Sequence, residues 1–426
     1  MADAQNTGSS EPGWPVLRET ITDRNILIYV LSLSAAGTGI WTARVAIGWL
    51  AWDLTRSSSW LGIIASAALL PAAILAPIGG AIADKIGPLR ALQWTQIGQL
   101  ILSVVIFILA VTEVLTIELL LAYILAKSVV ASLGWSSGGG FIRVLASDRN
   151  LLAAVMWKDI ATGVARIVGP ALSGMVIINA GTEFVFLVSI LGYSVFLYGL
   201  TKITVGSGWG PNYADGANSI GTSFKHAMEC VKNNREIPYL IAFLAIGLVG
   251  VDKFPVKELF VQDMGPPKSI VVAFAVGGAI TAVYMIWLAS RGSLGVLPRV
   301  LGPCFLACAL AILFLSLPLY NVAVLSVAAI LGAGITILST SVYVLALTFI
   351  PPRILFTGMG LYYLILTVVP MLFVFVLSVA VPHDTFYLRW LIAAIAMSLL
   401  ALWVWLRKRV PAIAEALGDP TSREVR

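Results

Sequence analysis

Long apolar runs alternate with short polar connections along almost the whole chain. Many runs reach about 20 residues, the length at which a helix crosses roughly 30 Å of hydrocarbon. The pattern therefore predicts an all-α membrane protein. Twelve transmembrane segments are expected, at residues 26–52, 60–83, 91–111, 116–140, 153–179, 184–201, 238–260, 269–289, 300–318, 322–349, 355–381 and 386–406.

The positions of the basic residues predict how these segments are oriented. An even number of segments places both termini on one side. If that side is cytoplasmic, the inner segments hold 18 of the 27 lysine and arginine residues, whereas the outer loops hold four and the spans five. Lysine and arginine accumulate on the cytoplasmic side of membrane proteins. We therefore expect a multi-pass protein of the cytoplasmic (inner) membrane with both termini inside.

The composition agrees with a chain that lies in lipid. Charged residues make up 11% of the 426 residues and the mean hydropathy is +0.95, too apolar for the surface of a soluble protein of this length. The inner basic residues account for the isoelectric point of about 9.2, so no nucleic-acid partner is expected. The polar N-terminal stretch lacks a signal-peptide pattern, and the first apolar segment is expected to stay as an anchor.

A polar segment at 202–236 divides the spans into two groups of six. Its first part is rich in Gly, Asn and Asp, which is typical of a linker. Its second part repeats Ile220, Phe224, Met228 and Val231 at helical spacing, which predicts an amphipathic helix on the inner membrane face. The expected organisation is an N-terminal segment at 1–25, a six-helix bundle at 26–201, the linker at 202–236, a second bundle at 237–406 and a tail at 407–426.

Two short inner loops recur at nearly the same offset in both halves. Arg291 follows Lys85 by 206 positions, and Arg353 follows Arg149 by 204. This spacing supports two related halves, as in transporters built from parallel repeats.

The stretch Gly79–Arg90, GGAIADKIGPLR, lies at the inner end of the second span. Gly79 and Gly80 allow a neighbouring helix to approach closely. Asp84 is expected to pair with a helix N-terminus or a basic group of the other half in one conformation only. Such a contact would act as a latch between two states. The alternative is a charged turn that only fixes the topology.

This stretch resembles the loop 2–3 signature of the major facilitator superfamily. The residues at the signature positions are Gly80, Asp84, Lys85, Gly87 and Arg90. Residues 24–200 are similar to the branch that contains the twelve-span exporters of macrolides and of catecholate siderophores. The resemblance implies two pseudo-symmetric six-helix bundles, alternating access and exchange of a drug-like cargo against protons.

The fifth span carries a second motif, VARIVGPALSG, which resembles the antiporter motif of proton-driven exporters. The residues that the resemblance assigns to it are Gly163, Arg166, Gly169, Pro170 and Gly174. The chain departs from the family pattern at Ser290, where the second half would carry an acidic residue. The fourth span also lacks the family's Arg-x-x-Gln-Gly pattern.

Three basic residues lie inside the predicted spans of the first half, namely Arg44, Lys127 and Arg166. Charges at such depth are costly, so they usually face a cavity or a partner. No carboxylate lies at the same depth in this half, which predicts a substrate cavity that favours anionic cargo. The alternative is that these residues pair with backbone carbonyls or distant acids and hold helices together.

Three aspartates are candidates for proton coupling. Asp53 ends the first span, Asp159 lies near the inner end of the fifth, and Asp252 lies in the outer third of the seventh. The alternative for Asp53 and Asp252 is an ion pair at the outer mouth.

The chemistry expected of an enzyme is missing from the sequence, which has no nucleotide-binding loop, nucleophile elbow or metal-ligand set. Its three cysteines form no disulfide framework. No cofactor and no metal are expected, and nothing requires an oligomer. The sequence predicts a proton-coupled exporter of a small amphiphilic molecule, with an importer of the same fold and a non-transporting sensor or assembly factor as alternatives.

Overall fold

The computed structural model describes residues 14–57, 71–206, 337–348 and 350–366, with isolated positions at 60–68, 225, 229 and 303–310. The predicted spans 238–260, 269–289 and 386–406 and the candidate Asp252 lie outside these residues. So do most of the span at 300–318 and most of the linker helix.

The helices of the first half follow the predicted spans. They are α2 (Arg24–Thr55), α4 (Ala72–Ile86), α5 (Pro88–Val111), α6 (Ile117–Leu145), α7 (Leu151–Asn179) and α8 (Val185–Lys202). All of these except α4 are long and apolar enough to cross a membrane. The count of twelve stays a prediction, because the described residues hold five such helices, or six if a bent pair in the second half is one span.

That bent pair comprises Ile337–Thr348 and Pro352–Leu366, which meet at an angle of 112°. Its members fall in the predicted spans 322–349 and 355–381. The second member opens with the 3-10 turn η3 (Pro352–Ile354).

Local chemistry sets several helix ends. The Asp23 carboxylate accepts hydrogen bonds from the backbone N–H groups of Asn25 and Ile26 and caps α2. Between α4 and α5, Gly87 has a φ of +92°, a conformation that residues with a Cβ adopt only under strain. Pro88 then opens α5, where a missing N–H costs nothing.

Two predicted boundaries are wrong at the inner side. The second span was expected to end at residue 83, but α4 continues to Ile86, so Asp84 lies in its last helical turn rather than in a loop. Likewise α6 continues past residue 140 to Leu145. An apolar run ends where the sequence becomes polar, but the helix can continue beyond that point when other parts of the protein pack against its last turns.

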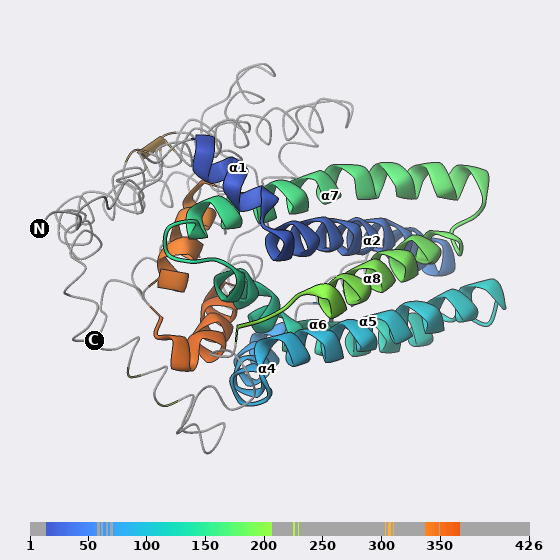
Figure 1. The fold of residues 1–426 in the computed structure, drawn as a ribbon. Coiled ribbons are helices and arrows are strands. Elements are labelled where there is room, and N and C mark those ends of the chain that lie inside the picture. The colour runs from blue at the N-terminus through green and yellow to red at the C-terminus, as the bar shows by residue number, and fades with distance from the viewer. Residues whose placement is uncertain are drawn as a thin grey trace, which may run out of the picture.

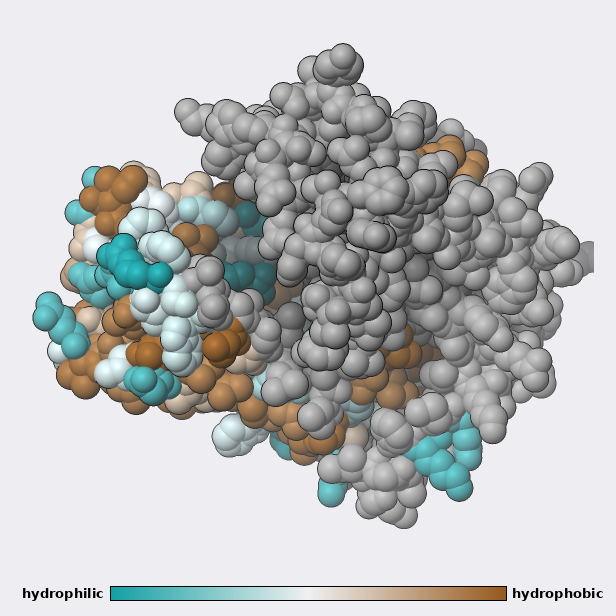
Figure 2. All heavy atoms as spheres, turned by 180° about the vertical axis from the view of Figure 1, so that it is seen from behind, coloured by the Kyte–Doolittle hydropathy of each residue, from teal (hydrophilic) through white to brown (hydrophobic). Residues whose placement is uncertain are grey.

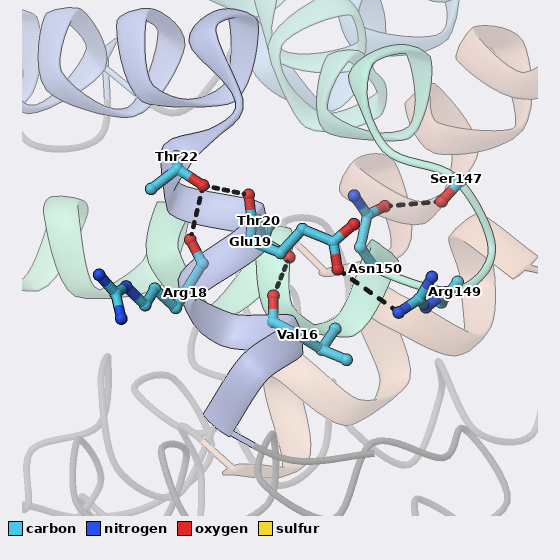
Figure 3. A network of polar contacts seen from close by, with 8 residues as sticks. All are labelled: Val16, Arg18, Glu19, Thr20, Thr22, Ser147, Arg149 and Asn150. Atoms are coloured by element: carbon cyan, nitrogen blue, oxygen red, sulfur yellow. Dashed lines mark hydrogen bonds and ion pairs between the residues drawn. The ribbon is translucent and has the colours of Figure 1, made fainter. Parts of the chain in front are cut away.

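The N-terminal segment contains a helix that the hydrophobic pattern does not predict. In α1 (Trp14–Thr22), the backbone carbonyl of Leu17 accepts a hydrogen bond of 3.2 Å from the indole N–H of Trp157 on α7. Figure 3 shows Glu19 of α1 reaching Arg149, just before α7, at 3.4 Å. With nine residues, α1 is too short to be found by looking for apolar runs that could cross a membrane.

The first half is a bundle in which α2 packs against α7 and α8, α6 packs against α4 and α5, and α5 contacts α8 (Figure 1). Apolar side chains cover much of the coloured surface in Figure 2. Ile178 and Leu191, for example, are 84% and 65% exposed. Side chains of this kind on the outside of a bundle are suited to lipid.

The described parts of the second half, orange in Figure 1, lie at one end of this bundle. The α4–α5 and α6–α7 connections lie at the same end, which is the end predicted to face the cytoplasm. We call it the inner end.

Candidate functional site

Asp84 joins the two halves at the inner end. Its carboxylate is fully buried and accepts hydrogen bonds from the backbone N–H groups of Phe356 at 3.1 Å and Thr357 at 2.9 Å. The Thr357 hydroxyl donates a third bond of 2.5 Å. These donors belong to the first turn after η3, where the unpaired N–H groups and the helix dipole favour a negative charge. The expected contact with a helix N-terminus of the other half is therefore present, while its role as a latch stays a prediction.

Gly80 makes this contact sterically possible. A Cβ built at Gly80 would collide with the backbone carbonyl of Phe356, and one built at Gly360 would collide with the backbone of α4 at Ala76 and Pro77. Gly79 lies equally close to the backbone of Leu133 on α6. The backbone of another helix thus lies close to each glycine of the pair, as their small size allows.

The other residues of the signature surround this contact. Lys85 lies in the last turn of α4 and Arg90 in the first turn of α5, and both side chains are exposed. Gly87 makes the turn between the two helices through its positive φ. The signature thus places one carboxylate inside the protein and two cations outside it.

A second contact between the halves involves the fifth span. The Asp159 carboxylate lies 3.2 Å from the ammonium of Lys158 and accepts a hydrogen bond of 2.6 Å from the Thr340 hydroxyl. The Lys158 ammonium also lies 4.1 Å from the centre of the Tyr343 ring. The Tyr343 hydroxyl donates to the carbonyl of Gly139 on α6. Sequence reasoning missed Thr340 and Tyr343, because nothing in their own span marks them as charge partners.

The glycines of α6 could have signalled this interface. A Cβ at Gly139 would collide with the Tyr363 side chain, and one at Gly140 with the Phe356 ring. The run SSGGG therefore lets aromatic side chains of the second half lie against the α6 backbone. Small residues at that position in an apolar segment are typical of a close helix contact.

Arg44 of α2 and Arg166 of α7 both lie close to Trp41, where these two helices pack together. The Arg44 guanidinium lies 4.4 Å from the centre of the Trp41 ring, and that of Arg166 lies 5.6 Å from the same ring. Gly169 permits the contact, since a Cβ there would collide with the Trp41 side chain. The Thr42 hydroxyl also donates to the Gly169 carbonyl at 3.2 Å.

Lys127 lies on α6 among tyrosines. Its ammonium donates to the Tyr123 hydroxyl at 3.0 Å and lies 5.9 Å from the centre of the Tyr193 ring. Aromatic side chains thus contact all three cations predicted from the sequence, Arg44 and Arg166 through Trp41 and Lys127 through Tyr123 and Tyr193. We call these residues the basic cluster: Arg44, Lys127 and Arg166 with Trp41, Tyr123 and Tyr193.

The remaining candidates lie apart from this cluster. A Cβ built at Gly163 or Gly174 would meet no described atom within 4 Å beyond its chain neighbours and the backbone of its own helix, and Pro170 lies within a continuous α7. Asp53 pairs with Arg56 at 2.5 Å, and the two side chains are 56% and 68% exposed. The structure therefore places Asp53 in an exposed ion pair at the outer end of α2.

Comparison with known proteins agrees with this architecture. A family model described as Major Facilitator Superfamily matches residues 29–374. The Staphyloferrin A transporter of Staphylococcus aureus (strain NCTC 8325 / PS 47) is 20% identical over 158 residues, which cover 37% of this chain and 40% of that relative. The match thus spans less than half of the relative.

Two solved structures share the fold. The crystal structure of a bacterial homologue of the iron transporter ferroportin, in an outward-facing state, has a TM-score of 0.70 and 14% identity over 90% of this chain and 99% of that one. The human organic anion transporter MFSD10 gives the same TM-score of 0.70, identity of 14% and coverage of 90% and 99%. The family match shows that the chain belongs to the Major Facilitator Superfamily, a family of membrane transporters rather than enzymes, and the two structures show that it shares their fold.

Proposed function

We propose that this protein is a secondary active exporter that exchanges a small, anionic, amphiphilic molecule for protons. The observation that carries the proposal is the basic cluster. Its cations lie within spanning helices, and the partners described for Lys127 and Arg166 are aromatic rings and a phenol hydroxyl rather than carboxylates. Lys127 is half-buried and the Arg166 side chain is exposed, so a ligand can reach both charges, and a charge within a spanning helix usually faces a cavity or a partner.

The aromatic members of the cluster suit an amphiphilic cargo. The Trp41 ring lies close to the guanidinium groups of both arginines. Tyr193 is buried, and its hydroxyl donates a hydrogen bond of 3.3 Å to the side-chain oxygen of Gln99. Rings can hold the apolar part of a molecule while the guanidinium groups hold its charged part. The cluster therefore offers both kinds of contact that such a cargo needs.

Alternating access requires that contacts at one end break while those at the other end form. The contacts of Asp84 and Asp159 with the second half supply such a set at the inner end. Breaking them would open the path from the cytoplasm to the basic cluster. The export direction is supported by the resemblance of the fifth span to the antiporter motif of exporters.

The test is untargeted mass spectrometry of cells and medium, comparing a deletion strain with its complemented parent. We expect an anionic compound that builds up in the deleted cells and is depleted from their medium. The relative named Staphyloferrin A transporter makes that molecule the first to examine. A compound left behind in the medium of the deleted strain would instead show import. The absence of any difference would favour the non-transporting alternative.

A further inference from the structure

The Lys158–Asp159 pair differs from every other ion pair in the part of the chain that the structure describes. The others lie at exposed helix ends or loops, and at least one partner in each has a side chain that is 56% exposed or more. In this pair the side chains are 15% and 26% exposed. It is also the pair whose carboxylate accepts a hydrogen bond from the second half, through Thr340.

Tyrosines from α2 and from both described segments of the second half interact electrostatically with this pair. The groups that face it from the packed elements are Tyr29 of α2, Tyr343 of the segment Ile337–Thr348, and Tyr362 and Tyr363 of the segment Pro352–Leu366. Tyrosine hydroxyls are neutral near physiological pH. The Asp159 carboxylate is therefore the negative charge that balances Lys158 in this contact.

We propose that Asp159 is the group whose protonation releases the inner end, with Lys158 and Thr340 as its positioning residues. The proposal rests on the exchange of cargo for protons and identifies where the proton acts. While Asp159 is ionised, it neutralises Lys158 and accepts the bond from Thr340, so the two halves stay together. Once it is protonated, Lys158 is left with an uncompensated charge among tyrosines, which favours opening to water.

Asp84 is poorly suited to the same task. It is fully buried and holds two backbone N–H groups and a hydroxyl, so protonation would leave donors without an ionised acceptor. Asp159 holds one hydroxyl and one ammonium and keeps a quarter of its side chain accessible. Among the described residues, Asp84 and Asp159 are carboxylates that accept hydrogen bonds across the halves, and Asp159 is the more accessible of the two.

The order of proton binding, opening and proton release is the order that exchange of cargo for protons requires. A proton bound while the inner end is closed would release that end, and the proton would then leave to the cytoplasm. Loss of the proton would restore the ion pair and close the inner end again. Each cycle would thus bring one proton inward for each opening toward the cytoplasm.

The experiment is hydrogen–deuterium exchange on the purified full-length protein in lipid nanodiscs over a pH series, corrected for intrinsic exchange. The reporters are the amides of Phe356 and Thr357, which donate to Asp84. In the unaltered protein we expect protection of these amides to fall on the order of tenfold as the pH is lowered. In Asp159→Asn it should be low and independent of pH.

Three further variants serve as controls for this experiment. Thr340→Val should lower protection at every pH but retain its pH dependence, and Asp159→Glu should retain a pH response. Glu113→Gln, a change of an exposed carboxylate in the outer turn after α5, should behave like the unaltered protein. A normal pH response in Asp159→Asn, or a lost one in Asp159→Glu, would overturn the proposal. The exporter proposal is judged separately, by cargo flux and by variants of the basic cluster.

Discussion

The inner end and the basic cluster hold their charges in opposite ways. At the inner end, Asp84 accepts three hydrogen bonds and Asp159 has both an ammonium and a hydroxyl. In the basic cluster, Lys127 and Arg166 contact aromatic rings, which attract a cation without neutralising it. A fully paired site is suited to hold one conformation, whereas a site that keeps its charge is suited to bind a ligand. The predictions below test that division.

Removing the Asp84 carboxylate should have the largest effect. Asp84→Ala leaves two backbone N–H groups of the second half without their acceptor, and bonds to an ionised group contribute about 1.5–3 kcal/mol each. We expect export to fall at least about a hundredfold and the amides of Phe356 and Thr357 to lose protection. Thr357→Val, which removes only the hydroxyl donor, is the matched control and should cost less. Full export by Asp84→Ala would show that the contact is not part of the cycle.

Gly80→Ala should prevent the halves from closing without removing any charge. The added methyl group meets the backbone of Phe356, which cannot move aside as a flexible side chain could. We expect a cost of about 1–3 kcal/mol to the closed inner end, seen as faster labelling of cysteines placed there. Gly163→Ala is the matched control, because its added carbon would meet no described atom within 4 Å beyond its chain neighbours and the backbone of α7. Equal labelling in the two variants would contradict the close packing at Gly80.

Neutralising the basic cluster should affect cargo and spare the inner end. In the double variant of Lys127→Gln and Arg166→Gln, we expect export of an anion to fall on the order of tenfold or more, since two attractive charges are lost. Exchange at the amide of Thr357 should be unchanged. Lys202→Gln is the control, because Lys202 also lies over a tyrosine ring, 5.1 Å from the centre of Tyr198, but at the end of α8. Unchanged export by the double variant would favour a structural role for these cations.

The sequence predicts those parts of the fold that are set by the apolar interior of the membrane. Runs of apolar residues long enough to cross a bilayer place five spanning helices in the first half to within a few residues at most ends. The end of α6 is an exception, and so is the end of α4, which is not one of these five; both are turns held by tertiary contacts. The helix α1 is missed for the same reason, since it is held by Trp157 and Arg149 rather than by its own length.

The partners of the charged residues are harder to predict than the residues themselves. Asp84, Asp159 and the three cations are recognisable because charge is rare in apolar segments. The partners of Asp159 and its neighbour Lys158, namely Thr340 and Tyr343, are ordinary residues of an apolar span, and they lie about 180 positions away along the chain. Only the packing of the two halves identifies them.

The smallest effect is expected at Asp53, the other candidate for proton coupling in the described residues. Its ion pair with Arg56 is largely exposed, and exposed pairs contribute about 0–1 kcal/mol. Asp53→Asn should therefore leave both the rate of export and its pH dependence within about fivefold of the unaltered protein. The measurement is proton-driven cargo flux in proteoliposomes at several external pH values, with Asp159→Asn in parallel. If Asp53→Asn abolished the pH dependence and Asp159→Asn did not, proton coupling would belong to the outer end, and the division between the inner end and the basic cluster would have to be redrawn.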